Sequence, residues 1–439
     1  MNNKKTLAYF STSIFLLINL YFLFTVNIEN RIINDGYNII SISERLNFGK
    51  DYLNTLVSVE KPPLYIVLIS IINDFLSANI TIIIIFQLCL AFVTAIVAEN
   101  IYEIFFNKKD YIVFTLVLLN PNLIAHVNFI LTETVYSFFL TIVFFYYFKW
   151  YSKKKLDSMF LCGLFLGFAS LTRYEGIYLM FVIMVLMFFL VLKNKKYKFT
   201  IKSLFIFFFA ILISYGPWVF ANKNSESKNI GTNEKELEHL SWNITLLEST
   251  IIRDKIDLNY LHDNKIEFEA KKKFNQILKE KDSLTKSDEI NWYRNYYLKK
   301  LFSYPFTSYV KLWSKSTMKF FFSSGSTYLN ILFGNINVKN PENFTLDKNI
   351  NSNAKNIKFI VLFLNLFLKI LCFIGLLKIL SKIHDHQYLA ALSFVLFSLL
   401  IVIFNGHARS RLPIEGLLFI LTVYGYNYLI KFIKIKKNE

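Results

Sequence analysis

The 439-residue chain is poor in the residues that interrupt helices, with 13 glycines and 7 prolines. Long helices are therefore expected to be its main element. It has only 3 cysteines, and they show neither the spacing of a zinc site nor that of a disulfide framework. It also lacks a glycine-rich phosphate loop and the Gly-x-Ser-x-Gly turn of hydrolases. These absences argue against nucleotide hydrolysis within the chain, so any energy source must arrive with a substrate.

Hydrophobic residues make up 54% of the chain and form runs that match the thickness of a bilayer, which needs about 20 residues per helix. The runs predict an all-α polytopic membrane protein. The segment 62–76 opens with two prolines, contains polar residues and is short for a crossing, so we expect it to be re-entrant or juxtamembrane. The candidate spans are 7–26, 80–105, 111–129, 133–149, 156–172, 175–192, 200–221, 357–380, 388–404 and 414–431.

The formal net charge of +18 is concentrated in short lysine tracts between these runs. This placement follows the positive-inside rule and argues against a nucleic-acid interface. If 62–76 does not cross, nearly every tract is cytoplasmic, both termini are cytoplasmic and about ten helices span the membrane. The predicted division is an N-terminal transmembrane core over 1–221 with a first external loop at 27–79, an external lid region with amphipathic helices over 222–356, and C-terminal transmembrane helices over 357–439.

The same topology places charged residues of both signs at the external face. Charges at the ends of membrane helices are costly and mark a functional site by default. Arginine forks and a lysine can hold a phosphate, and an aspartate can take a proton from an acceptor hydroxyl. We therefore expect a site for a phosphorylated lipid, formed from Asp35, Lys61, Glu133, Arg173, Glu175, His407, Arg409 and Arg411.

The first external loop and three later stretches carry a family resemblance. An acidic residue after the first helix is followed by ISERLNFGKDY and EKPPLY, and then by LNPNLIAHVNFILTETVYSFFL, GLFLGFASLTRYEGIYL and RSRLPIEGLLFILTVYG. Together they resemble GT-C glycosyltransferases, in the branch of the protein O-mannosyltransferases and the aminoarabinose transferases that modify lipid A. The resemblance implies a GT-C-like fold and an inverting transfer of a sugar from a polyprenyl-phosphate carrier to an acceptor hydroxyl outside the cytoplasm. The region 222–356 shows no such resemblance.

The resemblance also implies residue roles. Asp35 matches the catalytic base, Lys61 the lysine that contacts the carrier phosphate, and Glu133 the acidic position of the second external turn. Asn-Asp-Gly stands at 34–36 where many relatives carry an Asp-Glu pair, which weakens the case for a metal held by that pair. No metal ligand is assigned, although a divalent cation stays open. The candidate catalytic residues are Asp35 and Glu133, and the candidate substrate-binding residues are Lys61, Tyr37, Arg173, Arg409, Arg411 and His407.

Three of these residues also have a purely structural interpretation. Asp35 can cap the helix that follows it, and Lys61 can anchor the chain among lipid headgroups. Glu133 can pair with Arg173 without contacting a substrate.

The predicted function is a glycosyltransferase of the plasma (inner) membrane with a polyprenyl-phosphate-linked hexosyl or pentosyl donor. Its acceptor is a lipid, a glycan or a protein. The alternative is a polytopic transporter or a lipid-linked-sugar flippase, which predicts charges within the spans and two similar halves. Here the charges gather at one face and the halves look unlike. A wall-polymer or O-antigen ligase-type enzyme is a weaker alternative, since such enzymes lack an early-loop aspartate followed by a double proline.

Overall fold

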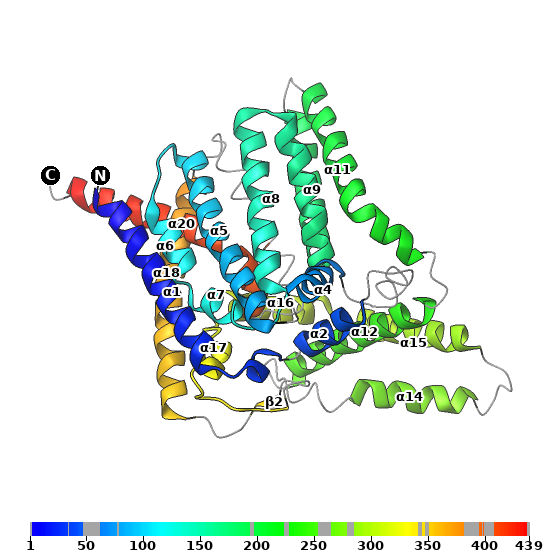
Figure 1. Cartoon of the computed structure of the whole chain (residues 1–439). Coiled ribbons are helices and arrows are strands. Elements are labelled where there is room, and N and C mark those ends of the chain that lie inside the picture. Colours follow the sequence, from blue (N-terminus) through cyan, green and yellow to red (C-terminus); the bar gives the residue numbers. More distant parts are fainter. Residues whose placement is uncertain are drawn as a thin grey trace.

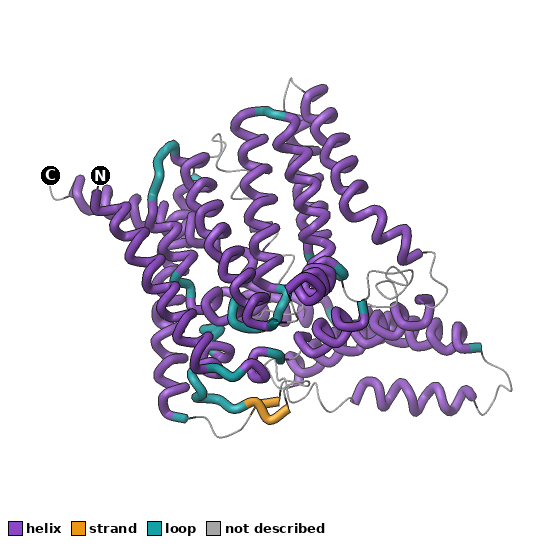
Figure 2. Tube along the Cα trace, in the orientation of Figure 1, coloured by secondary structure: helices purple, strands orange, loops and turns teal. Residues whose placement is uncertain are grey.

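The computed structural model describes residues 2–33, 35–46, 62–76, 79–193, 197–223, 228–252, 265–278, 285–340, 345–346, 351–381, 395–396, 398 and 408–436. Over these residues the chain is almost entirely helical (Figures 1 and 2). The strands described are one short antiparallel pair, β1 (Val338–Asn340) and β2 (Thr345–Leu346). The predicted all-α class is confirmed.

Long apolar helices form the main bundle (Figure 1). They are α1 (Asn2–Thr25), α5 (Ile80–Phe106), α8 (Glu133–Lys153), α9 (Leu156–Thr172), α10 (Gly176–Lys193), α11 (Tyr197–Lys223), α18 (Ser352–Leu380) and α20 (Ala408–Lys436). Among the described residues, 5 helices are long and apolar enough to cross a membrane, namely α1, α5, α11, α18 and α20. The count of ten crossings stays a prediction, because 388–404 falls largely outside the described residues.

The candidate span 111–129 is not one continuous helix, which corrects the interpretation from sequence. It consists of α6 (Tyr111–Leu118) and α7 (Pro121–His126). The Asn120 side chain accepts a hydrogen bond from the backbone N–H of Asn122 at 3.0 Å and caps α7. Pro121 takes the first helical position, where its missing N–H costs nothing. With 8 residues, α6 is about 12 Å long and cannot cross a bilayer core alone.

The segment after the double proline forms α4 (Leu64–Leu76), a helix of 13 residues. Figure 1 shows it nearly along its axis while α8 and α9 run up the page, so it lies across the bundle. It packs on α2 (Asp35–Arg45), α5 and α9, with Tyr65 and Ile69 fully buried. This position agrees with the expectation of a juxtamembrane or re-entrant helix.

Two buried polar side chains hold the irregular turn that precedes α8. Gln87 of α5 donates from Nε2 to the Phe129 carbonyl at 2.9 Å. Arg31, at the end of the short 3-10 helix η1 (Ile28–Arg31), donates from Nη1 to Asn128 Oδ1 at 3.1 Å. The Ile130 N–H in turn donates to the Arg31 carbonyl at 3.0 Å. Since irregular backbone within a membrane protein must find internal partners, these contacts fix the turn that leads to Glu133.

A close crossing of α18 and α20 orients the last helix. A Cβ at Gly375 would lie 2.1 Å from the Leu421 carbonyl oxygen, and one at Gly425 would lie 2.1 Å from that of Leu371. Only glycine permits this approach, and small residues are typical of tightly packed membrane helices. The crossing therefore determines where the N-terminal turn of α20 can lie.

The helices of 222–356 lie beside one end of the bundle (Figure 1). They are α12 (Lys228–Ile252), α14 (Lys265–Leu278), α15 (Lys286–Phe302), α16 (Phe306–Phe322) and α17 (Thr327–Leu332). A small core formed by Ile244, Ile266 and Tyr297 joins α12, α14 and α15. These helices reach the bundle through α16, which packs on α18 and α20.

Candidate active site

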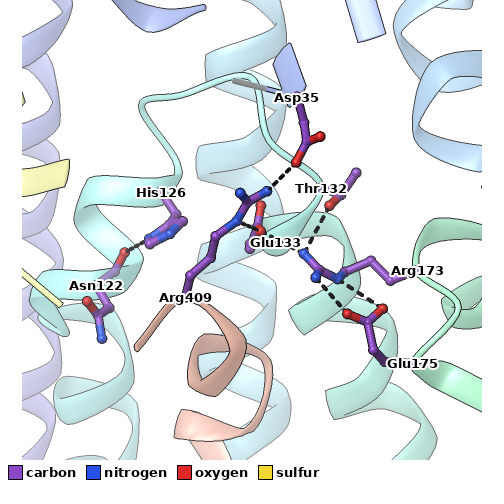
Figure 3. Close-up of polar contacts among 8 residues, drawn as sticks. All are labelled: Asp35, Asn122, His126, Thr132, Glu133, Arg173, Glu175 and Arg409. Carbon is purple, nitrogen blue, oxygen red and sulfur yellow. Dashed lines mark hydrogen bonds and ion pairs between the residues drawn. The ribbon is translucent and has the colours of Figure 1, made fainter. Parts of the chain in front are cut away.

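Five charged side chains alternate in sign along one continuous series of ion pairs, which we call the ion-pair chain (Figure 3). Arg409 Nη2 lies 2.9 Å from Asp35 Oδ2, and Arg409 Nε donates to Glu133 Oε1. Arg173 Nη1 lies 2.7 Å from the same Glu133 oxygen, and Arg173 Nη2 lies 2.7 Å from Glu175 Oε1. The structure thus brings together five of the eight residues that the sequence placed at one face.

The ion-pair chain forms where helix ends meet. Asp35 begins α2 and Glu133 begins α8. Arg173 and Glu175 lie in the turn between α9 and α10, and Arg409 lies in the first turn of α20. The N-terminus of a helix favours a negative charge, which suits the two carboxylates that begin helices. The arginines then neutralise these carboxylates from the neighbouring helix ends.

Gly36 allows α2 to begin close to the turn before α8. A Cβ at this position would lie 2.7 Å from the Ile130 carbonyl oxygen, closer than real Cβ atoms approach. A glutamate there, as in the Asp-Glu pair of many relatives, would force that turn to move. The close approach therefore explains why a glycine, and not a second carboxylate, follows Asp35.

The members of the ion-pair chain differ in accessibility. The Asp35 side chain is 40% exposed and that of Arg409 is 20% exposed, whereas that of Glu133 is completely buried. Asp35 is therefore the carboxylate among these three residues that a substrate can reach. The ion-pair chain contains three carboxylates and two guanidinium groups, so these five side chains together carry one net negative charge.

The two charged residues in the turn between α9 and α10 stabilise each other's ionised form. Burial alone would raise the pKa of Glu175, but the Arg173 guanidinium outweighs burial and holds this pKa below its ordinary value. Burial alone would lower the pKa of Arg173, but Glu175 and Glu133 raise it above its ordinary value. Both groups are consequently ionised at any physiological pH.

Two residues that sequence reasoning missed lie beside Arg409. His126 and Tyr328 have ring centroids 4.6 Å apart, and the Tyr328 side chain interacts with Arg409. His126 Nδ1 donates to the Asn122 carbonyl at 2.8 Å (Figure 3), and its buried Nε2 has no partner among the described residues. His126 could have been suspected as a polar residue inside an apolar run. Nothing in the sequence singles out Tyr328.

Arg411 lies apart from the ion-pair chain, although it follows Arg409 by two positions. Residues two apart on a helix point about 200° away from each other. Arg411 is fully buried, its Nε lies 2.5 Å from Glu415 Oε1, and its two terminal nitrogens donate to the carbonyls of Phe321 and Ser323, each at 3.1 Å. It thus satisfies carbonyls at the C-terminal end of α16, which a helix leaves without internal partners.

The remaining predicted residues are placed as follows. Tyr37 lies in the first turn of α2, partly buried and two positions after Asp35. Lys61 and His407 lie outside the described residues. In the part of the chain that the structure describes, no group of three or more His, Cys, Asp or Glu side chains could hold a metal ion.

The helical bundle, in which five of the described helices are long and apolar enough to cross a membrane, defines a multi-pass membrane protein with charged residues gathered at its helix ends. Residues 47–222 match the model of the family described as dolichyl-phosphate-mannose-protein mannosyltransferase. This match confirms the resemblance to the O-mannosyltransferase branch of the GT-C superfamily.

Among curated proteins, none matches the chain. Among solved structures, the archaeal oligosaccharyltransferase AglB from Archaeoglobus fulgidus, in complex with an inhibitory peptide and a dolichol-phosphate, is similar at 12% sequence identity and a TM-score of 0.49. The alignment covers 100% of this chain and 52% of that protein, so this chain spans about half its length.

Proposed function

We propose that this protein is an inverting glycosyltransferase of the plasma membrane. It would move a sugar from a polyprenyl-phosphate carrier to an acceptor hydroxyl at the external face. The family match over 47–222 supports the donor class and makes mannose the first sugar to test. The observation that carries the proposal is Asp35, a half-exposed carboxylate held 2.9 Å from the guanidinium of Arg409.

The proposed orientation is supported by α8. This helix of 21 residues begins at Glu133 in the ion-pair chain and ends at Lys153, about 30 Å away. Lys153 opens the lysine tract 153–155. By the positive-inside rule such a tract is cytoplasmic, so the ion-pair chain would face the outside. The acceptor hydroxyl would then reach Asp35 at the level of the external lipid headgroups.

In the proposed reaction Asp35 acts as the general base. As the acceptor oxygen bonds to the anomeric carbon, the bond from that carbon to the carrier phosphate oxygen breaks, and the hydroxyl proton passes to the Asp35 carboxylate. Attack opposite the leaving phosphate inverts the anomeric configuration. A carboxylate with a reference pKa of about 4 suffices when the phosphate departs early.

Cations must hold that phosphate, and the ion-pair chain alone carries a net negative charge. Arg409 supplies one partly exposed guanidinium, and we assign Lys61 as the second cation. A phosphate bound to Arg409 would compete with Asp35 for the same guanidinium. Donor binding would thereby release the Asp35 carboxylate for the acceptor hydroxyl.

The other residues would support this arrangement. Glu133, buried between two arginines, would position Arg409 without contacting the acceptor. Tyr37 and His407 are kept as proposed substrate contacts. We assign the helices of 222–356 the role of a lid that selects the acceptor.

The test uses the purified full chain in nanodiscs with radiolabelled polyprenyl-phosphate mannose and extracted envelope acceptors. Asp35→Asn should lower turnover by about 10² to 10⁴, the usual worth of a general base. The matched control is Asp157→Asn, which changes an exposed carboxylate in the first turn of α9, at the far end from Arg173. It should transfer sugar like the wild type. Full turnover in Asp35→Asn would remove Asp35 as the base, and donor flipping without sugar transfer would favour the flippase.

A further inference from the structure

A pocket of about 550 Å³ lies between α5 and α8, at the ends of these helices that are opposite the ion-pair chain. In Figure 1 both helices run upward to these ends. The apolar part of its wall includes Ile104 and Phe145, and the polar part includes Asn100, Lys149, Ser152 and Lys153. All the residues that line it belong to the part of the chain that the structure describes. A pocket that combines cations with an apolar wall suits an amphiphilic anion.

The two lysines of the pocket lack a carboxylate partner. Lys149 and Lys153 are four positions apart on α8, so they lie on one face of this helix. Among the described residues, neither forms an ion pair. Glu103, the one carboxylate that lines the pocket, already lies 3.5 Å from Lys109. These four side chains together carry two net positive charges, which an anionic ligand would partly neutralise.

Lys149 lies deeper than the topology of the chain requires. A lysine in the last turn of a helix, such as Lys153, complements the helix dipole and follows the positive-inside rule. Lys149 lies one turn earlier and is partly buried. Its Nζ is 5.4 Å from the ring centroid of Phe145 and 5.6 Å from that of Tyr146. Because aromatic ring faces attract an ammonium group, these contacts stabilise the Lys149 charge beside the pocket.

The pocket lies at the level of lipid headgroups. The length of α8, about 30 Å, equals the thickness of the hydrocarbon core of a bilayer. Because its Glu133 end belongs to the ion-pair chain, Lys153 marks the opposite boundary of this core. Lys149 lies only about 6 Å from that boundary, a distance that a lysine side chain spans by extending towards the headgroups. Under the proposed orientation this boundary is the cytoplasmic one.

An exposed apolar stripe on α5 leads from the middle of the bundle to the pocket. Its members Ile85, Cys89, Val93 and Ile96 are exposed, and their spacing of three or four positions places them on one face of α5. The same spacing leads on to Asn100, which lines the pocket. An acyl chain that lies along this stripe would therefore have its headgroup at the pocket.

We propose that this pocket binds an anionic phospholipid of the cytoplasmic leaflet, with its phosphate between Lys149 and Lys153 and an acyl chain along the exposed stripe of α5. Basic pockets between membrane helices on the cytoplasmic side are suited to such headgroups. The assignment of the leaflet rests on the orientation in the proposed function. The binding itself does not depend on the transferase reaction, because the pocket and the ion-pair chain lie at opposite ends of α8.

The experiment is native mass spectrometry of the delipidated full chain, titrated with phosphatidylglycerol, phosphatidylcholine or water-soluble glycerol phosphate. We expect one tightly bound phosphatidylglycerol and weaker binding of the other two. Lys149→Gln combined with Lys153→Gln should weaken phosphatidylglycerol binding about tenfold or more, the worth of one charge-assisted contact. The corresponding double change to arginine keeps both charges and should retain the lipid.

Two further variants separate the pocket from the general positive charge of this side. Lys198→Gln combined with Lys202→Gln is the matched control, because these exposed lysines are also four positions apart, near the start of α11, at an end predicted to be cytoplasmic. This control should bind phosphatidylglycerol as the wild type does. Ser152→Trp places a large side chain at an exposed lining position and leaves both pocket lysines in place. It should weaken binding without any change of charge.

Three outcomes would overturn the proposal. The first is equal affinity for the two phospholipids, and the second is an equal effect of the pocket and control lysine pairs. The third is glycerol phosphate binding as tightly as the lipid, because the acyl chain would then have no part in recognition. Labelling of Lys153→Cys from outside whole cells by an impermeant thiol reagent would refute the leaflet and the proposed orientation together. Intact phosphatidylglycerol binding in a protein without transferase activity would refute the proposed function alone.

Discussion

Glu133→Gln tests whether the ion-pair chain is one buried unit. The Glu133 carboxylate is completely buried and receives hydrogen bonds from Arg409 Nε and Arg173 Nη1. Glutamine keeps the shape of the side chain but removes the charge, and its amide nitrogen is a donor that cannot pair with a guanidinium. Both arginines would then face a neutral group in a buried setting.

The expected loss of unfolding free energy depends on the ion-pair partner that each arginine keeps. Removing one partner of a buried ion pair costs about 3–5 kcal/mol. Here each arginine keeps its other carboxylate, Asp35 or Glu175, and is 20% exposed. We therefore expect the lower end of that range, about 3 kcal/mol of unfolding free energy. Turnover should fall as well, because Arg409 loses the contact that orients its Nε.

The assay is equilibrium unfolding in mixed micelles, followed by tryptophan fluorescence, alongside the transferase assay. Glu175→Gln is the control, because Glu175 ends the ion-pair chain, has Arg173 as its ion-pair partner and is 34% exposed. Removing the charge of this partly exposed end residue should cost less than removing the fully buried charge of Glu133. If Glu133→Gln cost no more than Glu175→Gln, Glu133 would not be the centre of a buried network.

Three further predictions concern packing and pH. Gly36→Ala should cost about 1–3 kcal/mol and lower turnover, since its Cβ would press on a carbonyl 2.7 Å away; unfolding and activity measured together check this. Gly425→Leu should destabilise the α18–α20 crossing at least as much, whereas Gly216→Ala, whose Cβ would meet nothing closer than 3.9 Å, should unfold like the wild type. The pKa of Glu175 is depressed by Arg173, so its contribution to stability is present above the ordinary pKa of about 4 and is lost as pH falls through the folded-state value. The stability difference between wild type and Glu175→Gln should therefore shrink on acidification, and an increase would contradict the assignment.

The helical class and the gathering of charges at one end could be predicted because both rest on one-dimensional patterns. Long apolar runs report helix length, and lysine tracts report which helix ends share a side. The break between α6 and α7 could not be predicted this way. Asn120 and Pro121 interrupt an apolar run without lowering its mean hydropathy enough to divide it, and the capping contacts that stabilise the break are visible only in three dimensions.

The two arginines at the start of α20 show where sequence reasoning ends. Arg409 and Arg411 have the same chemistry, lie two positions apart and were equal candidates for a phosphate contact. The helix turns them to different sides, so that one meets Asp35 and Glu133 while the other meets Glu415 and the carbonyls that end α16. Which side faces the charged site depends on the rotation of α20, and α20 is fixed by packing against α18 far from either arginine. In a site built from helix ends, the sequence of each end therefore supplies the reactive groups. Which of two neighbouring residues faces the site is decided by packing contacts elsewhere in the bundle.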